Sequence, residues 1–129
     1  MDGQTTERLI DLAKQASERS YSPYSHFPVG AAVLAASGKI YAGTNIENAS
    51  YGATMCAERV AVFKAISEGE KEIAGLAVYA GAATVAFPCG MCLQVLSEFA
   101  GDIPVFLSSA SETREYRLSD LLPHPFGEV

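Results

Sequence analysis

The chain has 129 residues, of which 49% are hydrophobic and 19% are charged, and its formal net charge is −6. This length suits one domain spanning residues 1–129, and the hydrophobic content excludes a disordered chain. A net negative charge repels a phosphate backbone, so we expect no nucleic-acid partner.

The three cysteines cannot all pair with one another, and the first residues lack the charged and apolar regions of a secretory signal. We therefore expect a cytoplasmic protein whose thiols are free to bind metal. Residues 73–87 carry no charge, but they are fewer than the ~20 residues that a membrane-spanning helix needs, and Gly75 and Gly81 interrupt them. A buried strand followed by a loop is the better interpretation, and we expect no membrane contact.

The spacing of apolar residues predicts alternating helices and strands along the chain. In the first helix, Leu9, Leu12, Ala13 and Ala16 share one face. The expected elements are a helix over 5–19, strands over 29–36 and 39–44, a helix over 57–68, a strand over 73–80, a helix that opens at Pro88, a strand over 103–107, an edge strand over 115–118 and a final helical turn over 119–122. This order indicates an α/β fold in which a mixed sheet lies between helices.

All three cysteines fall at the predicted N-terminal ends of two helices. Cys56 precedes one helix, whereas Cys89 and Cys92 open the other and are spaced to share a helix face. The positive end of a helix dipole favours thiolates, and three thiolates bind zinc while leaving its fourth position open, as in catalytic sites. The alternative is that the cysteines are small buried hydrophobic residues, but their spacing favours a metal site.

Glu58 follows Cys56 by two residues. At the start of a helix its carboxylate can reach the space beside the metal without binding it, and there it could carry protons during a reaction. The alternative role is that of a negative charge that stabilises the helix dipole, and only the neighbouring cysteines favour catalysis.

Several segments together resemble a known enzyme family. Cys56-Ala57-Glu58-Arg59 and Pro88-Cys89-Gly90-Met91-Cys92 resemble the signature of zinc deaminases. The resemblance extends, in family order, to Phe27-Pro28-Val29-Gly30-Ala31-Ala32, Asn45-Ile46-Glu47-Asn48 and Leu121-Leu122-Pro123 with Phe126, which are similar to the homotetrameric cytidine deaminases.

This resemblance implies a three-layer α/β/α fold with a five-stranded mixed sheet and one Zn²⁺ per chain on Cys56, Cys89 and Cys92. It also implies hydrolytic deamination of cytidine or deoxycytidine to the uracil nucleoside with release of ammonia, a step of pyrimidine salvage, by a homotetramer. Glu58 would be the catalytic proton carrier.

The family pattern further implies roles for residues around the metal. Asn45 and Glu47 match the residues that bind the ribose 3′-hydroxyl, and Phe27 matches an aromatic residue beside the base. The Ala57 backbone matches a contact to the pyrimidine edge. The other matches are Tyr51 and Phe126, which neighbouring subunits contribute to the pocket, and Arg59, which offsets the negative charge of the thiolates. Without the resemblance, residues 45–48 would be an ordinary turn, the two phenylalanines ordinary packing and Arg59 a solvated side chain.

Two positions depart from the family pattern. Phe87 and Leu93 stand where the family usually has serine and arginine, whereas Gln94 is kept. Loss of a cation near the thiolates could weaken water activation or change the substrate. Deamination of another small aminopyrimidine or nucleoside analogue therefore remains an alternative, as does a zinc-stabilised module that binds nucleosides without turnover.

Overall fold

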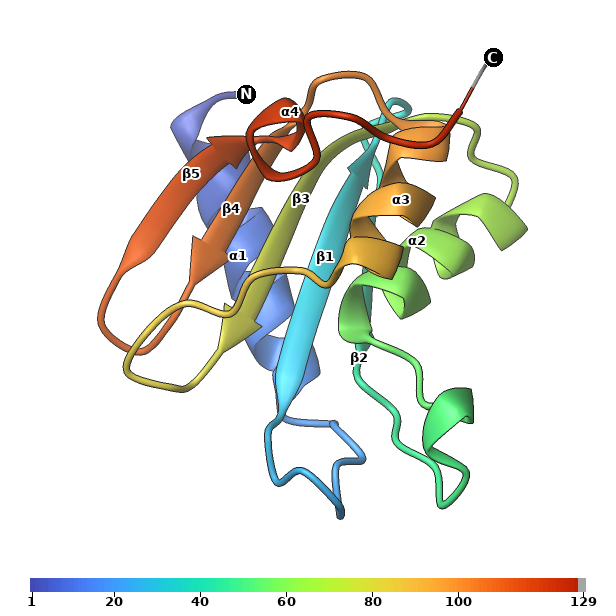
Figure 1. The fold of residues 1–129 in the computed structure, drawn as a ribbon. Helices are drawn as coiled ribbons and strands as arrows, with labels where there is room; N and C mark the ends of the chain where they lie inside the picture. Colours follow the sequence, from blue (N-terminus) through green and yellow to red (C-terminus); the bar gives the residue numbers. More distant parts are fainter. Residues whose placement is uncertain (128–129) are drawn as a thin grey trace.

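Five strands form one mixed sheet in the computed structural model, which describes residues 1–127 (Figure 1). The strands are β1 (Val29–Ala35), β2 (Ile40–Thr44), β3 (Ile73–Ala80), β4 (Pro104–Ser108) and β5 (Thr113–Arg117), and they lie in the order β2-β1-β3-β4-β5. β3 and β4 are parallel, whereas β1 pairs antiparallel with both β2 and β3, and β4 with β5. The predicted five-stranded mixed sheet is confirmed.

Helices cover both faces of the sheet. The helix α1 (Gly3–Ser17) lies on one face, and α2 (Ala57–Ser67) and α3 (Gly90–Phe99) lie on the other (Figure 1). Each interface has its own buried apolar cluster, with Leu9 and Ala13 of α1 in one and Val62 and Leu96 of α2 and α3 in the other. The three-layer α/β/α architecture is therefore confirmed. Two short elements complete it, η1 (Tyr51–Ala53) and α4 (Leu118–Leu121).

Several element boundaries differ from the predicted ones by one or two residues because capping residues set them. The first helix starts at Gly3 rather than residue 5, since the Asp2 carboxylate accepts a hydrogen bond of 2.7 Å from the Thr5 N–H. The last helix starts at Leu118, and β5 ends before it, since the Asp120 carboxylate accepts from the Arg117 N–H at 2.9 Å. The third helix does not open at Pro88 but at Gly90.

Two glycines let helices approach the sheet closely. A Cβ added to Gly30 of β1 would lie 1.8 Å from the Ala13 carbonyl oxygen of α1. A Cβ added to Gly43 of β2 would lie 2.7 Å from the Ala61 nitrogen of α2. The absence of a side chain at Gly43 therefore sets the distance of α2 from the sheet, and with it the place of the residue that precedes this helix.

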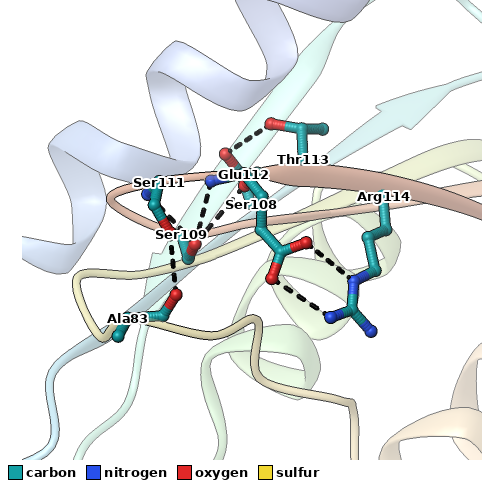
Figure 2. A network of polar contacts seen from close by, with 7 residues as sticks. All are labelled: Ala83, Ser108, Ser109, Ser111, Glu112, Thr113 and Arg114. Carbon is teal, nitrogen blue, oxygen red and sulfur yellow. Dashed lines mark hydrogen bonds and ion pairs between the residues drawn. The ribbon is translucent and has the colours of Figure 1, made fainter.

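The loop between β3 and α3 is fastened to the neighbouring β4–β5 hairpin (Figure 2). The Ser111 hydroxyl donates to the Ala83 carbonyl at 2.8 Å, and the Ala110 N–H donates to the Ala82 carbonyl at 3.3 Å. The Ser109 hydroxyl accepts from the Ser111 N–H at 3.2 Å and so holds the turn itself. This network fixes the start of the loop that leads to Cys89.

The uncharged segment over residues 73–87 consists of β3, which is almost entirely buried, and this loop. Within residues 1–127, none of the helices combines the length and the apolar character that crossing a membrane requires.

Candidate metal centre and substrate site

Cysteines occupy the N-cap positions of two helices. Cys56 caps α2 and Cys89 caps α3, both with extended backbones (φ −72° and −71°) and neither with a side-chain hydrogen bond to its helix. Ser, Thr, Asp or Asn at such a position would stabilise the helix by about 1 kcal/mol. Both helices forgo this stabilisation, and their first turns place the thiols of Cys56, Cys89 and Cys92 together.

The three sulfur atoms lie at distances that suit one tetrahedral metal ion. The Cys89 and Cys92 sulfurs are 3.4 Å apart, those of Cys56 and Cys89 are 3.9 Å apart, and all three lie within 4.8 Å of one another. Zinc–sulfur bonds of about 2.3 Å in a tetrahedron place sulfurs roughly 3.8 Å apart. Cys92 is buried whereas Cys89 is exposed, so the cluster is open on one side. The donor set and its geometry therefore fit zinc with an accessible fourth position.

The thiols and Arg59 are coupled electrostatically. The Arg59 guanidinium donates to the Cys56 sulfur over 3.5 Å. The neighbouring Cys92 thiol and then Arg59 stabilise a thiolate at Cys56, and they lower the pKa of Cys56 to about 5. The same interaction with Cys56, together with burial, raises the pKa of Cys92. Arg59 therefore lies where its positive charge can stabilise a thiolate at Cys56.

The Glu58 carboxyl lies in the first turn of α2 and is 7% exposed. Burial raises the pKa of Glu58 to about 7. Its oxygens are not part of the three-sulfur cluster. A carboxyl with a pKa near neutrality can both accept and release a proton at neutral pH, which is what a general acid–base group must do.

Asn45 braces the loop over residues 18–28. Its Oδ1 accepts from the Ser20 hydroxyl at 2.5 Å and from the Val29 N–H at 3.0 Å, and its Nδ2 donates to the Phe27 carbonyl at 2.9 Å. The Asn45 amide thus connects the loop to the start of β1 and holds the backbone of Phe27 beside Asn45.

Glu47 binds the same loop and lines a cavity. Its buried carboxylate accepts from the N–H groups of Tyr24 and Ser25 at 2.9 and 3.1 Å, and from the Ser25 hydroxyl. The hydrogen bond from Ser25 lowers the pKa of Glu47, so the group is ionised at neutral pH. The cavity has a volume of about 380 Å³ and is also lined by Tyr51 and Thr54.

Tyr24 and Ser25 also line this cavity, and the sequence did not predict this role for either. Tyr24 packs edge-on against Tyr51, with ring centroids 5.5 Å apart. Tyr24 and Ser25 lie in a loop whose sequence has no apolar periodicity. The one indication of their role in the sequence was that they are close to Phe27. Their contacts depend on the conformation of the loop.

Two predicted pocket residues lie far from each other. Tyr51 and Phe126 are 73% and 82% exposed. Figure 1 shows the green segment of η1 and the loop that follows α1 at one end of the molecule, and the C-terminal tail at the other. The structure therefore groups Tyr51 with Glu47, but one chain does not bring Phe126 to them.

The two departures from the family pattern have a structural explanation. Leu93 is 6% exposed and belongs to the apolar cluster beneath α3. Phe87 packs on Tyr116 of β5, with ring centroids 5.5 Å apart. Both side chains therefore pack against other apolar or aromatic groups, and neither adds a charge near the thiols.

Comparisons with known proteins agree with this geometry. Residues 3–107 match the family model described as the cytidine and deoxycytidylate deaminase zinc-binding region. The chain is 48% identical to a cytidine deaminase of Sporosarcina psychrophila over 95% of this chain and 91% of the relative, and 44% identical to one of Mycobacterium tuberculosis over 89% and 84%. The crystal structure of cytidine deaminase from Burkholderia pseudomallei superposes with a TM-score of 0.89 at 40% identity, covering 98% of this chain and 100% of that one. The chain therefore belongs to the cytidine and deoxycytidylate deaminase family and carries its zinc-binding region.

Proposed function

We propose that this chain is a zinc-dependent hydrolase that converts cytidine or deoxycytidine and water into the corresponding uracil nucleoside and ammonia, a reaction of pyrimidine salvage. The observation that carries this proposal is the cluster of three thiols at two helix N-termini beside a buried carboxyl whose pKa is about 7. A site that only stabilised the fold would need the thiols but not Glu58, which disfavours a non-catalytic module.

In this proposal Cys56, Cys89 and Cys92 hold the zinc ion. When bound, zinc lowers the pKa of a water molecule and so supplies the nucleophile for C4 of the pyrimidine. The exposed side at Cys89 leaves room for this water and the substrate. Arg59 stabilises the thiolates from its position beside Cys56.

Glu58 would move the protons. It takes a proton from the attacking water, delivers it to N3 of the pyrimidine, and then transfers the second proton of the water to the departing amino group, which leaves as ammonia. Burial beside the cluster supports this role, because it holds the carboxyl at a pKa where both transfers are possible. The backbone of Ala57, which opens α2 next to Glu58, would contact the pyrimidine edge, and Phe27 would pack against the base.

Asn45 and Glu47 would recognise the sugar. The ionised Glu47 carboxylate accepts hydrogen bonds, and a sugar hydroxyl could donate to it in addition to Ser25 or in its place. Asn45 would reach the sugar by exchanging the Ser20 hydroxyl at Oδ1 for a sugar hydroxyl. The cavity that Glu47 lines supports the assignment of Glu47.

A homotetramer would complete each pocket. Large apolar side chains that are exposed on this chain favour burial against other copies, and they include Phe63, Phe87 and Met91 in addition to Tyr51 and Phe126. Because Phe126 lies far from the cavity of its own chain, we propose that it enters the pocket of a neighbour. Free thiol ligands suit the reducing cytoplasm, where we place the enzyme.

A screen of ammonia release tests the substrate. We expect cytidine and deoxycytidine to react with a kcat/KM at least ~10-fold above that of free cytosine. The reason is that free cytosine has no sugar hydroxyls with which Asn45 and Glu47 could form hydrogen bonds. Cytidine monophosphate should also be poor, because the ionised Glu47 repels phosphate. Equal efficiency on cytosine and cytidine would remove the sugar roles of both residues.

Replacing Glu58 by Gln tests the proton carrier. The amide keeps the shape of the side chain but cannot take up the proton, so kcat on cytidine should fall by about 10⁴ while zinc content and fold persist. The control is Glu68→Gln, which changes an exposed carboxyl at the other end of the same helix and should leave turnover unchanged. Near-native turnover of Glu58→Gln would contradict the assignment, and loss of zinc would make Glu58 a ligand.

Mixed assemblies test the contribution of the tail to a neighbour. Chains that lack residues 125–129 retain Glu58 but have no Phe126, whereas Glu58→Gln chains retain the tail but not the base. At a low cytidine concentration each should be weakly active alone, the truncated chains because their KM is raised and the Glu58→Gln chains because they lack the base. Co-assembly of the two should restore turnover, because the tail of one completes the pocket of the other. Absence of recovery in mixed oligomers isolated by tags on both chains, or an active monomer in light scattering, would contradict the assembly.

A further inference from the structure

One side chain, that of Gln94, forms hydrogen bonds with both polar backbone groups of Phe126. The Phe126 N–H donates to Oε1 of Gln94 at 2.9 Å, and Nε2 of Gln94 donates to the Phe126 carbonyl at 2.7 Å. The Phe126 ring itself is 82% exposed, so packing within the chain does little to hold it. The two hydrogen bonds of Gln94 therefore hold the backbone of Phe126 in place.

The chemistry of glutamine suits this contact. Its amide presents one donor and one acceptor side by side, as a peptide group does, and so pairs with both polar groups of a single residue. A carboxylate would satisfy the Phe126 N–H but would face the Phe126 carbonyl without a donor. An alanine would satisfy neither group.

Gln94 lies on α3 away from the metal centre. It follows Cys92 by two residues, and side chains two apart in a helix point to different sides. A surface hollow of about 490 Å³ is lined by residues of both the helix and the tail, namely Gln94, Ser97, Glu98, Pro125, Phe126 and Gly127. The amide of Gln94 joins the two elements. In the proposed enzyme, α3 therefore binds zinc through the cysteines at its N-terminus and holds the tail through Gln94.

We propose that Gln94 is a positioning residue that fixes the Phe126 backbone and so presents the exposed ring to the pocket of a neighbouring copy. This inference rests on the proposed function, in which Phe126 completes that pocket. Fixing the backbone of one residue costs conformational entropy that corresponds to about a tenfold change in an equilibrium constant. When Gln94 fixes the residue beforehand, substrate binding does not have to supply that free energy. The effect should therefore appear in KM, while the proton transfers of Glu58 and hence kcat remain unchanged.

The test is a double-mutant cycle with kcat and KM measured on cytidine. We expect Gln94→Ala and Phe126→Ala each to raise KM roughly tenfold with kcat unchanged. The double variant should be no worse than Phe126→Ala alone, because Gln94 acts through Phe126. Gln94→Glu should raise KM as Gln94→Ala does. The control Gln15→Ala, at an exposed position on α1, should retain the wild-type KM.

Each other outcome overturns the inference in a recognisable way. If Phe126→Ala raises KM but Gln94→Ala does not, or if the two effects add, the pocket role of Phe126 stands and Gln94 does not act through it. If Phe126→Ala has the wild-type KM while cytidine is still turned over, the neighbour-pocket role fails, and this inference fails with it. If Gln94→Ala loses zinc or dissociates in light scattering, Gln94 is a structural residue of the assembly instead.

Discussion

Three thiolates held within a few ångströms of one another repel strongly, and a folded chain tolerates them only where positive charge compensates. Cys56 and Cys89 are 33 residues apart in the sequence, yet their sulfur atoms lie 3.9 Å apart. The sulfur atoms of Cys89 and Cys92 lie 3.4 Å apart. The chain meets this constraint with two helix N-termini, with Arg59 and, in the proposed enzyme, with zinc.

Most of the fold serves to place these two helix ends. Gly43 sets the distance of α2 from the sheet, because any side chain there would meet the Ala61 backbone. The hydrogen bonds of Ser111 and Ala110 fix the start of the loop that carries the chain from β3 to Cys89. Glu58 is then buried beside the thiols as a consequence of the same docking of α2, which raises its pKa. The docking of α2 against the sheet therefore determines both the position of Cys56 and the raised pKa of Glu58.

The sequence was sufficient to predict the parts of the site that depend on local structure. Cys56, Cys89 and Cys92 could be located because apolar spacing defined the helices and the cysteines stood at their starts. Helix boundaries were less accurate, since Asp2 and Asp120 set them through side-chain hydrogen bonds that apolar spacing does not reveal.

Features of the site that depend on tertiary contacts could not be predicted from the sequence. The pairing of Glu47 with Ser25 depends on the path of a loop without periodicity, and the raised pKa of Glu58 depends on how completely the docked helix buries it. Gln94 was noted in the sequence as a retained family residue, but its contact with Phe126 joins positions 32 residues apart. Apolar patterning carries no information on such a contact.

The most direct test of the metal centre is X-ray absorption spectroscopy at the zinc edge, on protein purified with its metal and without substrate. If Cys56, Cys89 and Cys92 hold the ion, the spectrum should fit three sulfur ligands at about 2.3 Å and one oxygen ligand, with one zinc per chain. A fit with fewer than three sulfurs, a histidine nitrogen in the fourth position, or a chain that binds no zinc would contradict the account.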